Sequence, residues 1–266
     1  MGKGIGGFIM NSKYKQILTI DCDFFMKPCI QLYNDLIGSL PIHNHDAEWH
    51  NIFEKLNCEA FMSHDDDNLS FMLETIKGLK CPIYVGLDHH SILRAMDLVY
   101  RKDNTFSGPF DIVNIDHHHD IAYNSEQIRD LELFSFVSCG SWVGFLEKQK
   151  LLHNYYWVAN ENSKPFNFNL PIFPPYRENA VFVINKKDFK HDPENYSLCY
   201  ISSSLDFIPP QEKETYFTFL RALIARYNDK ISWIYDSYDN HFKMKMILDG
   251  LNKDKKATYE IATEHI

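Results

Sequence analysis

The acidic and histidine side chains that follow one apolar run are the clearest candidates for chemistry in this 266-residue chain. The run Ile112–Ile115 leads into Asp116, His118 and Asp120, which are spaced i, i+2 and i+4. On an extended chain these three side chains share one face. If the run is a strand of an open parallel sheet, they lie at its carboxyl end, where such sheets keep their active sites. Two carboxylates and an imidazole that converge there favour a site for a divalent metal ion.

Two other apolar runs end in residues of the same kind. Residues 17–20 lead into Asp21 and Asp23, and two like charges this close disfavour each other unless a cation neutralises them. Residues 82–87 have the pattern of a short buried strand and lead to His89. Four carboxylates and two imidazoles suit a pair of hard or borderline ions such as Mn²⁺, with a water bridging them. The predicted metal ligands are Asp21, Asp23, His89, Asp116, His118 and Asp120.

The three loops together resemble the metal-binding loops of the arginase/deacetylase superfamily. Residues 86–89, Gly-Leu-Asp-His, resemble the Gly-Gly-Asp-His-Ser loop of the arginase branch, and residues 116–120 resemble its Asp-Ala-His-x-Asp loop. Residues 21–23, Asp-Cys-Asp, supply the acid pair of its Ser-x-Asp-x-Asp loop. Arginases place that pair late in the chain, whereas here it lies near the N-terminus. The resemblance therefore implies an arginase-like sheet whose N-terminal ligand strand is rearranged or circularly permuted.

The closest resemblance is to a branch with an N-terminal Asp-x-Asp-Phe/Tyr-Phe strand, an Asp-x-His-x-Asp loop and a downstream Asn-Trp. That branch includes bacterial peptide arginases, which convert arginine residues of a ribosomally made precursor peptide to ornithine. In this chain Ser141-Trp142 stands in place of Asn-Trp, and the likeness runs from about Leu18 to Pro210. The resemblance implies two Mn²⁺ ions as cofactors and a ribosomal precursor peptide as the partner that is modified.

The loop at residues 202–210 follows another strand pattern and should reach the rim of the same site. It resembles the start of the arginase Ser-x-Asp-x-Asp loop, but Ile208 replaces the second acid. Asp206 is therefore expected to act in catalysis by binding the substrate, because a carboxylate matches a guanidinium in a bidentate pair. Ser204 is assigned to the substrate with it. The alternative is that Asp206 caps a helix that starts near Pro210.

Several aromatic side chains beside the proposed ligands have roles that the sequence leaves open. His90 is a candidate proton shuttle, because an imidazole titrates near neutral pH, and a supporting or exposed position is its alternative. Trp142 either packs at the start of a buried helix beneath the loops or forms a wall of the substrate site. Strand alternation turns His117 and His119 away from the ions, which leaves them to hydrogen-bond around the ligands.

The resulting hypothesis is a dimanganese hydrolase that converts arginine side chains, within a precursor peptide, to ornithine and urea. One alternative is a zinc-dependent deacetylase of the same superfamily, with a single ion at Asp116, His118 and an acid such as Asp21. That alternative leaves three of the six proposed ligands without a partner. A hydrolase of free arginine or agmatine is a second alternative, and a metal-stabilised peptide-binding protein without turnover is a third.

Apolar runs and helical patterns alternate along the chain, which predicts an α/β three-layer sandwich with a mostly parallel sheet. We expect one domain over residues 1–266, with residues 1–12 as a flexible leader and residues 160–178, rich in proline, as a loop. The predicted strands are 16–21, 82–87, 110–115, 154–159, 180–185 and 198–203. The predicted helices are 47–57, 68–79, 91–101, 140–150, 211–227 and 240–251.

Composition narrows the classes of partner. The net charge of −9 disfavours nucleic acid as a partner. It would attract a cationic substrate, and the alternative is that it only keeps the protein soluble. The six cysteines form no Cys-x-x-Cys pair and sit in or beside apolar runs, which indicates buried reduced thiols in a cytoplasmic protein. No apolar run has the length of a membrane span, so no membrane partner is expected.

Overall fold

The structure is a computed structural model that describes residues 12–27, 63–122, 125–134, 137–163 and 180–234, together with positions 247 and 251. Several sequence predictions fall outside these ranges. They are the leader at residues 1–11, the helix at 47–57, most of the helix at 240–251 and the loop from residue 164 to residue 178.

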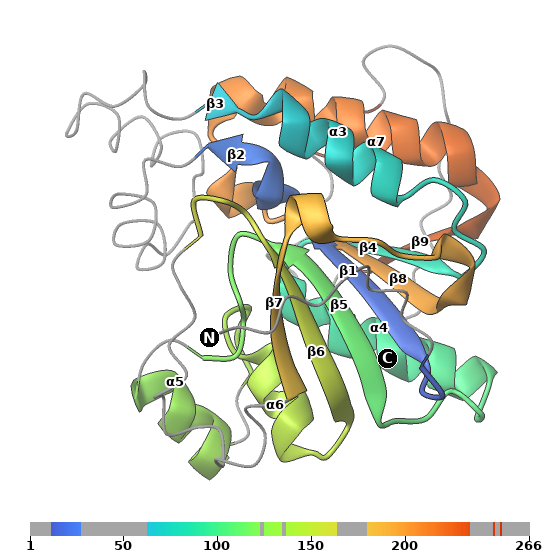
Figure 1. The fold of residues 1–266 in the computed structure, drawn as a ribbon, viewed down its shortest axis with the longest axis vertical. Coiled ribbons are helices and arrows are strands. Elements are labelled where there is room, and N and C mark those ends of the chain that lie inside the picture. The colour runs from blue at the N-terminus through green and yellow to red at the C-terminus, as the bar shows by residue number, and fades with distance from the viewer. Residues whose placement is uncertain are drawn as a thin grey trace.

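A seven-stranded sheet forms the centre of the described structure, and every strand pairing in it is parallel (Figure 1). The strand order is β7-β6-β5-β1-β8-β4-β9. In that order the bounds are Val181–Asn185, Leu152–Ala159, Phe110–Asp116, Gln16–Asp21, Tyr196–Ser202, Ile83–Gly86 and Ile231–Ile234. The six predicted strands are confirmed, with shifts of up to two residues at their ends. Strand β9 was not predicted, because Ile-Ser-Trp-Ile is too short for a period to be read.

Helices cover both faces of this sheet and make it the middle of three layers (Figure 1). On one face lie α3 (Asp66–Thr75) and α7 (Lys213–Tyr227), and on the other lie α4 (Ile92–Lys102) and α6 (Trp142–Lys148). Strands covered on both faces need apolar side chains in both directions, which explains why their sequences read as continuous apolar runs. The predicted α/β sandwich with a mostly parallel sheet is therefore confirmed.

Strand β1 shows the two-sided burial most clearly. All six of its residues are buried. Leu18 and Ile20 pack in the core on the α3 and α7 side, whereas Ile17 packs in the core on the α4 and α6 side. This strand lies between β5 and β8, in the middle of the sheet. Its carboxyl end is therefore surrounded by the ends of other strands.

The remaining described elements are short. Strands β2 (Met26–Lys27) and β3 (Ser63–His64) form an antiparallel pair, and α5 (Ser125–Arg129) continues into a π-helical segment at Asp130–Phe134. Asp65 caps α3, since its side chain accepts hydrogen bonds from the N–H groups of Asp67 and Asn68 at 2.8 and 3.2 Å. The helix predicted at residues 68–79 therefore begins two residues earlier, at Asp66, and ends earlier, at Thr75.

Within the described part of the chain, none of the helices combines the length and the apolar character needed to cross a membrane.

Candidate metal centre

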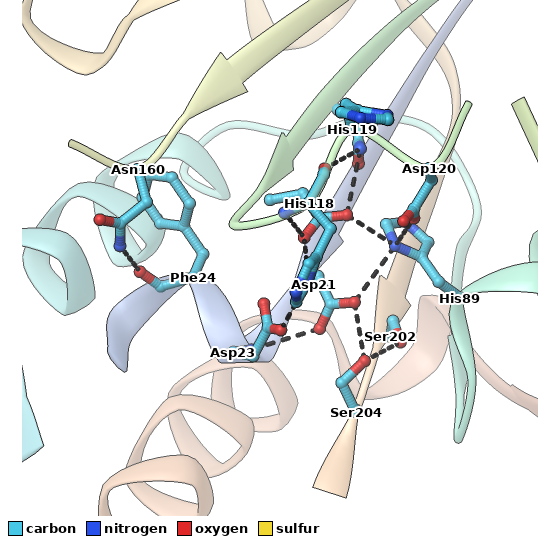
Figure 2. A network of polar contacts seen from close by, with 12 residues as sticks. Asp21, Asp23, Phe24, His89, His118, His119, Asp120, Asn160, Ser202 and Ser204 are labelled. Atoms are coloured by element: carbon cyan, nitrogen blue, oxygen red, sulfur yellow. Dashed lines mark hydrogen bonds and ion pairs between the residues drawn. The ribbon is translucent and has the colours of Figure 1, made fainter. Parts of the chain in front are cut away.

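The carboxyl ends of β1, β4 and β5 bring all six predicted ligands to one edge of the sheet, and all of them except Asp116 are labelled in Figure 2. Asp21 and Asp116 are the last residues of β1 and β5, and His89 follows β4 by three residues. Two groups of potential metal ligands result, and each holds its ligand atoms within 4.8 Å of one another. The first group is Asp21, His89 and Asp116, and the second is Asp23, Asp116 and His118.

The His89 imidazole faces more carboxylate oxygens than a single proton can satisfy. Its Nδ1 atom lies 3.2 Å from Asp21 Oδ2, 3.0 Å from Asp116 Oδ2 and 2.9 Å from Asp120 Oδ2. All four side chains are buried. Each of the three oxygens also accepts a hydrogen bond from a neutral donor, but one imidazolium sets a single positive charge against three carboxylates in a low-dielectric interior. A divalent cation would balance this excess of negative charge, and the donor set of three carboxylates and one imidazole is one that such ions accept.

The opposite nitrogen of His89 is already engaged. Its Nε2 atom lies 2.5 Å from the hydroxyl oxygen of Thr19, which is buried in the middle of β1. If Nε2 carries the hydrogen and donates it to Thr19, the lone pair of Nδ1 points at the carboxylates. Imidazoles that bind metals are held in this way by a hydrogen bond to their second nitrogen. The surroundings of His89 therefore fit a metal ligand.

The second group shares Asp116 with the first. His118 Nδ1 lies 3.2 Å from Asp23 Oδ2 and 3.7 Å from Asp116 Oδ1, and the backbone N–H of His118 donates to that same Oδ1 at 2.8 Å. Asp116 thus presents Oδ2 to the His89 group and Oδ1 to the His118 group. A carboxylate that divides its oxygens between two groups is suited to bridge two cations.

The pKa values show how strongly the charges in the cluster interact. Burial and nearby carboxylates raise the pKa of Asp23 and of Asp120 to about 7. Burial alone would lower the pKa of His89 and His118, but the surrounding carboxylates raise both well above the ordinary value. Burial would raise the pKa of Asp116, yet its hydrogen bonds with the two imidazoles hold it well below the ordinary value. The raised pKa values favour protons on these histidines and aspartates near neutral pH. A cation that bound the same side chains would have to displace those protons.

Neutral hydrogen-bond donors fix the orientation of the carboxylates. The Ser204 hydroxyl donates to Asp21 Oδ2 at 2.7 Å, and the side-chain amide of Asn114 donates to Asp116 Oδ2 at 3.1 Å. Trp142 Nε1 donates to Asp120 Oδ2 at 2.7 Å. These donors add no charge of their own, so they orient the acids without neutralising them.

Asp23 is positioned by a clamped turn rather than by a strand. It belongs to the 3₁₀ helix η1 (Cys22–Phe25), which follows β1. The carbonyl oxygen of Phe24 in that turn accepts hydrogen bonds from the amides of Asn160 at 2.8 Å and Asn68 at 3.2 Å (Figure 2 shows the Asn160 bond). Asn160 also donates to the carbonyl of Met26 at 3.3 Å. The end of β6 and the first turn of α3 therefore hold the turn in place.

The structure corrects the reason why three of the ligands meet. We expected residues 116–120 to stay extended, so that Asp116, His118 and Asp120 would share a strand face. Strand β5 instead ends at Asp116, and Asp120 adopts a left-handed backbone conformation with φ of 50°. His118 reaches Asp23 and Asp120 reaches His89 because the chain bends after the strand. His119 accepts a hydrogen bond at its Nδ1 from the backbone of Ile121, at 3.2 Å.

Of the other predicted site residues, two contact the proposed ligands directly. Ser204 contacts the proposed ligand Asp21, and Trp142 is fully buried, opens α6 and bonds to Asp120. His90 follows His89 in the 3₁₀ helix η4 (His89–Ser91), and its Nδ1 atom is buried without a hydrogen-bond partner. Asp206 lies in η9 (Leu205–Phe207), and its side chain is outside the described structure. The cap position of the helix that starts at Pro210 is Pro209, so Asp206 does not occupy it.

Sequence reasoning missed the residues that orient the ligands. Thr19 and Asn114 lie inside apolar strands, and they are paired partners in the register between β1 and β5. Each is a polar residue two positions before a ligand, and each contacts the cluster. The sequence could have indicated these residues, because each is a polar residue inside an apolar run, two positions before an acid. On a strand, residues two positions apart lie on the same face.

No family model matches this chain, and neither does any curated protein or solved structure. The resemblance to arginases therefore rests on the short motifs at residues 21–23, 86–89 and 116–120.

Proposed function

We propose that this protein is a metal-dependent hydrolase that holds two divalent cations and acts on the guanidinium group of arginine. One observation carries the proposal: three buried carboxylate oxygens lie within 3.2 Å of His89 Nδ1, and one of those carboxylates, Asp116, also serves a second group. A single imidazolium leaves the three carboxylates with an excess of negative charge, whereas divalent cations would balance it. An oxygen-rich donor set favours Mn²⁺ over ions selected by thiolates.

In this proposal the residues of the chain hold and orient the ions. Asp21, His89 and Asp120 would hold one ion, Asp23 and His118 would hold the other, and Asp116 would contribute to both. A pair of such ions supplies water that is activated for attack at neutral pH. Burial of the carboxylates keeps bulk water from competing, and the hydroxyl of Ser204 holds Asp21 in place.

The substrate class rests on the resemblance and on charge. The motifs resemble those of a branch that hydrolyses arginine side chains to ornithine and urea, and the net charge of −9 would attract a cationic peptide. The deacetylase alternative needs one group of two acids and a histidine, and Asp23, Asp116 and His118 form such a group. That alternative leaves the second group, Asp21, His89 and Asp116, without a role, and the second group is what favours two ions.

The proposal is tested by metal loading and product analysis on the full chain. Protein treated with a chelator is reloaded with Mn²⁺, Zn²⁺ or Mg²⁺ and incubated with arginine-containing peptides, free arginine, agmatine and acetyl-lysine peptides. We expect urea and ornithine from the peptides, with the highest kcat/KM for the Mn²⁺ protein, because part of the binding energy comes from peptide outside the reacting side chain.

Each alternative has its own outcome in this experiment. Release of acetate with Zn²⁺ alone identifies a deacetylase, and faster turnover of free arginine or agmatine identifies an ordinary ureohydrolase. Two bound ions and tight peptide binding without any product identify a binding protein. High-resolution mass spectrometry is needed beside the urea assay, because the cyanamide unit and the acetyl unit have the same nominal mass.

A further inference from the structure

The cluster is open to solvent on the side of His118. The His118 side chain retains 18% of its exposure, whereas the side chain of His89 retains 1% and those of Asp23 and Asp116 retain none. A molecule that arrives from solvent therefore meets the His118 group first. The side chains beside His118 are the ones that contact a substrate before it reaches the reacting centre.

Phe207 provides an aromatic surface at this open side. Its ring centroid lies 5.4 Å from that of His118, and the two ring planes are tilted by 53°. Phe207 ends η9, the short helix that follows β8, and its side chain is half-buried and packs against the core on the α3 and α7 side. The ring is thus held by packing on one side while part of it stays accessible.

We propose that Phe207 is the residue that selects a planar cation, by stacking its ring against the guanidinium of the bound substrate. This inference rests on the proposed function, because it names a specificity residue for that site. An aromatic face attracts a cation through its quadrupole, and the carboxylates nearby strengthen the attraction. A guanidinium is planar and weakly hydrated, so it stacks on an aromatic face, whereas an ammonium group keeps its water. Phe207 therefore discriminates between arginine and lysine side chains, which charge alone does not.

A purely structural role for Phe207 leads to a different expectation. If the ring only fills space beside the core, its replacement by leucine lowers thermal stability and leaves ligand selectivity unchanged. With a purely structural role, the effect of tryptophan or tyrosine at position 207 on stability would depend only on the volume of the new side chain. The selectivity between a planar cation, an ammonium ion and an uncharged side chain, rather than stability, is therefore the decisive measurement.

The test compares three ligands on the Mn²⁺-loaded full chain. The ligands are the N-acetyl methylamides of arginine, lysine and norleucine, bound in a calorimetric titration with urea measured in the same samples. We expect Phe207→Leu to weaken arginine binding by about 3- to 30-fold, with lysine and norleucine changed by less than about 2-fold. Phe207→Trp should retain or exceed the wild-type preference for arginine. Phe189→Leu is the matched control, since Phe189 is another half-buried ring packed on the same core, in contact with Phe71 and His191.

Two outcomes overturn the inference. One is a Phe207→Leu protein that folds, keeps its metal content and binds arginine as the wild type does. The other is an equal loss of affinity for all three ligands. Failure of the proposed function is separate: a wild type that prefers arginine through Phe207 but releases no urea keeps this inference and loses the hydrolase.

Discussion

Strand β5 carries an aspartate near each end, and the surroundings of the two differ. At the amino end, Asp111 Oδ1 lies 2.7 Å from Nδ1 of the half-exposed His153, so that one carboxylate meets one imidazole. The ring of Tyr14 covers His153 at a centroid distance of 3.7 Å. At the carboxyl end, Asp116 lies beside two imidazoles, and three more carboxylates lie beside the same two imidazoles. The first arrangement has one imidazole for one carboxylate, although Asp111 Oδ2 is buried without a hydrogen-bond partner, whereas the second has two imidazoles for four carboxylates.

The difference teaches that residue types alone do not identify a metal site. Asp and His occur at both ends of the strand, and both aspartates are fully buried. The site is distinguished by the ratio of acids to bases and by its position, where the ends of β1, β4, β5 and β8 meet. Among the described residues, both groups of potential metal ligands lie at that edge.

Substitution of the shared aspartate should have the largest effect. We expect Asp116→Asn to reduce Mn²⁺ binding from two ions to at most one and to lower kcat/KM by more than about 100-fold, because loss of a ligand exceeds the 10- to 100-fold typical of loss of a supporting residue. Metal analysis and urea release measure both effects. Asp111→Asn, the same change at the other end of the strand, should leave both unchanged. Equal losses in the two variants would remove the distinction between the two ends.

Stability without metal should fall as pH rises. Asp23 and Asp120 have pKa values of about 7 against 3.8 for an ordinary aspartate, so the folded state holds protons that the unfolded state releases, and raising the pH through this window disfavours folding. The raised pKa values of His89 and His118 act in the same direction: their contribution is present below about pH 6.5 and is lost as pH rises through the folded pKa.

Thermal denaturation checks this expectation. Protein with a chelator should lose more than about 1 kcal/mol of unfolding free energy between about pH 5 and about pH 8. Mn²⁺ should restore the loss and stabilise the protein most at the higher pH, because cations then compete with fewer protons. A metal-free protein that is more stable at the higher pH would contradict the claim that the clustered carboxylates hold extra protons in the folded state.

Loss of the hydroxyl that holds His89 should have an intermediate effect. Thr19→Val keeps the shape and removes the hydrogen bond to Nε2, so we expect Mn²⁺ affinity at the His89 group to fall by about 10- to 100-fold. Thr19→Ser retains a hydroxyl and should recover most of the affinity. If valine and serine behave alike, the hydroxyl does not set the orientation of His89.

Loosening the turn that carries Asp23 should have the smallest effect. Asn160→Ala removes the hydrogen bonds to the carbonyls of Phe24 and Met26, but Asn68 still bonds to Phe24. We expect a loss of less than about 10-fold in affinity for the second ion, with the first ion unaffected. A titration in which the tighter ion weakens instead would mean that the two groups are not independent.

Much of the sheet could be predicted, because buried parallel strands have a strong sequence signal. The run at residues 16–21 matches β1 residue for residue, and the alternation of runs and helical patterns predicted the layers. Strand β9 and the segment from Ser125 to Phe134 were missed, since the first is four residues long and the second is short and largely polar. Neither segment is long or apolar enough to show the repeat of apolar residues from which a strand or helix is predicted.

The ligand set could be predicted because acids and histidines follow three of the apolar runs, and the carboxyl ends of parallel strands meet at one edge of the sheet. Its geometry could not, because it depends on bends that no pattern shows. The left-handed Asp120 and the 3₁₀ turn at Asp23 decide which atoms meet. The roles of Thr19, Asn114 and Ser204 depend on strand register and on loop conformation, which a single sequence does not reveal.

The number of cations bound per chain tests the central claim most directly. Chelator-treated full-length protein is titrated with Mn²⁺ and analysed for bound metal, beside Asp116→Asn and the Asp111→Asn control. We expect two ions in the wild type and in Asp111→Asn, and at most one in Asp116→Asn. A wild type that binds no Mn²⁺, or one whose metal content is the same in all three proteins, would contradict a metal centre at the carboxyl edge of the sheet.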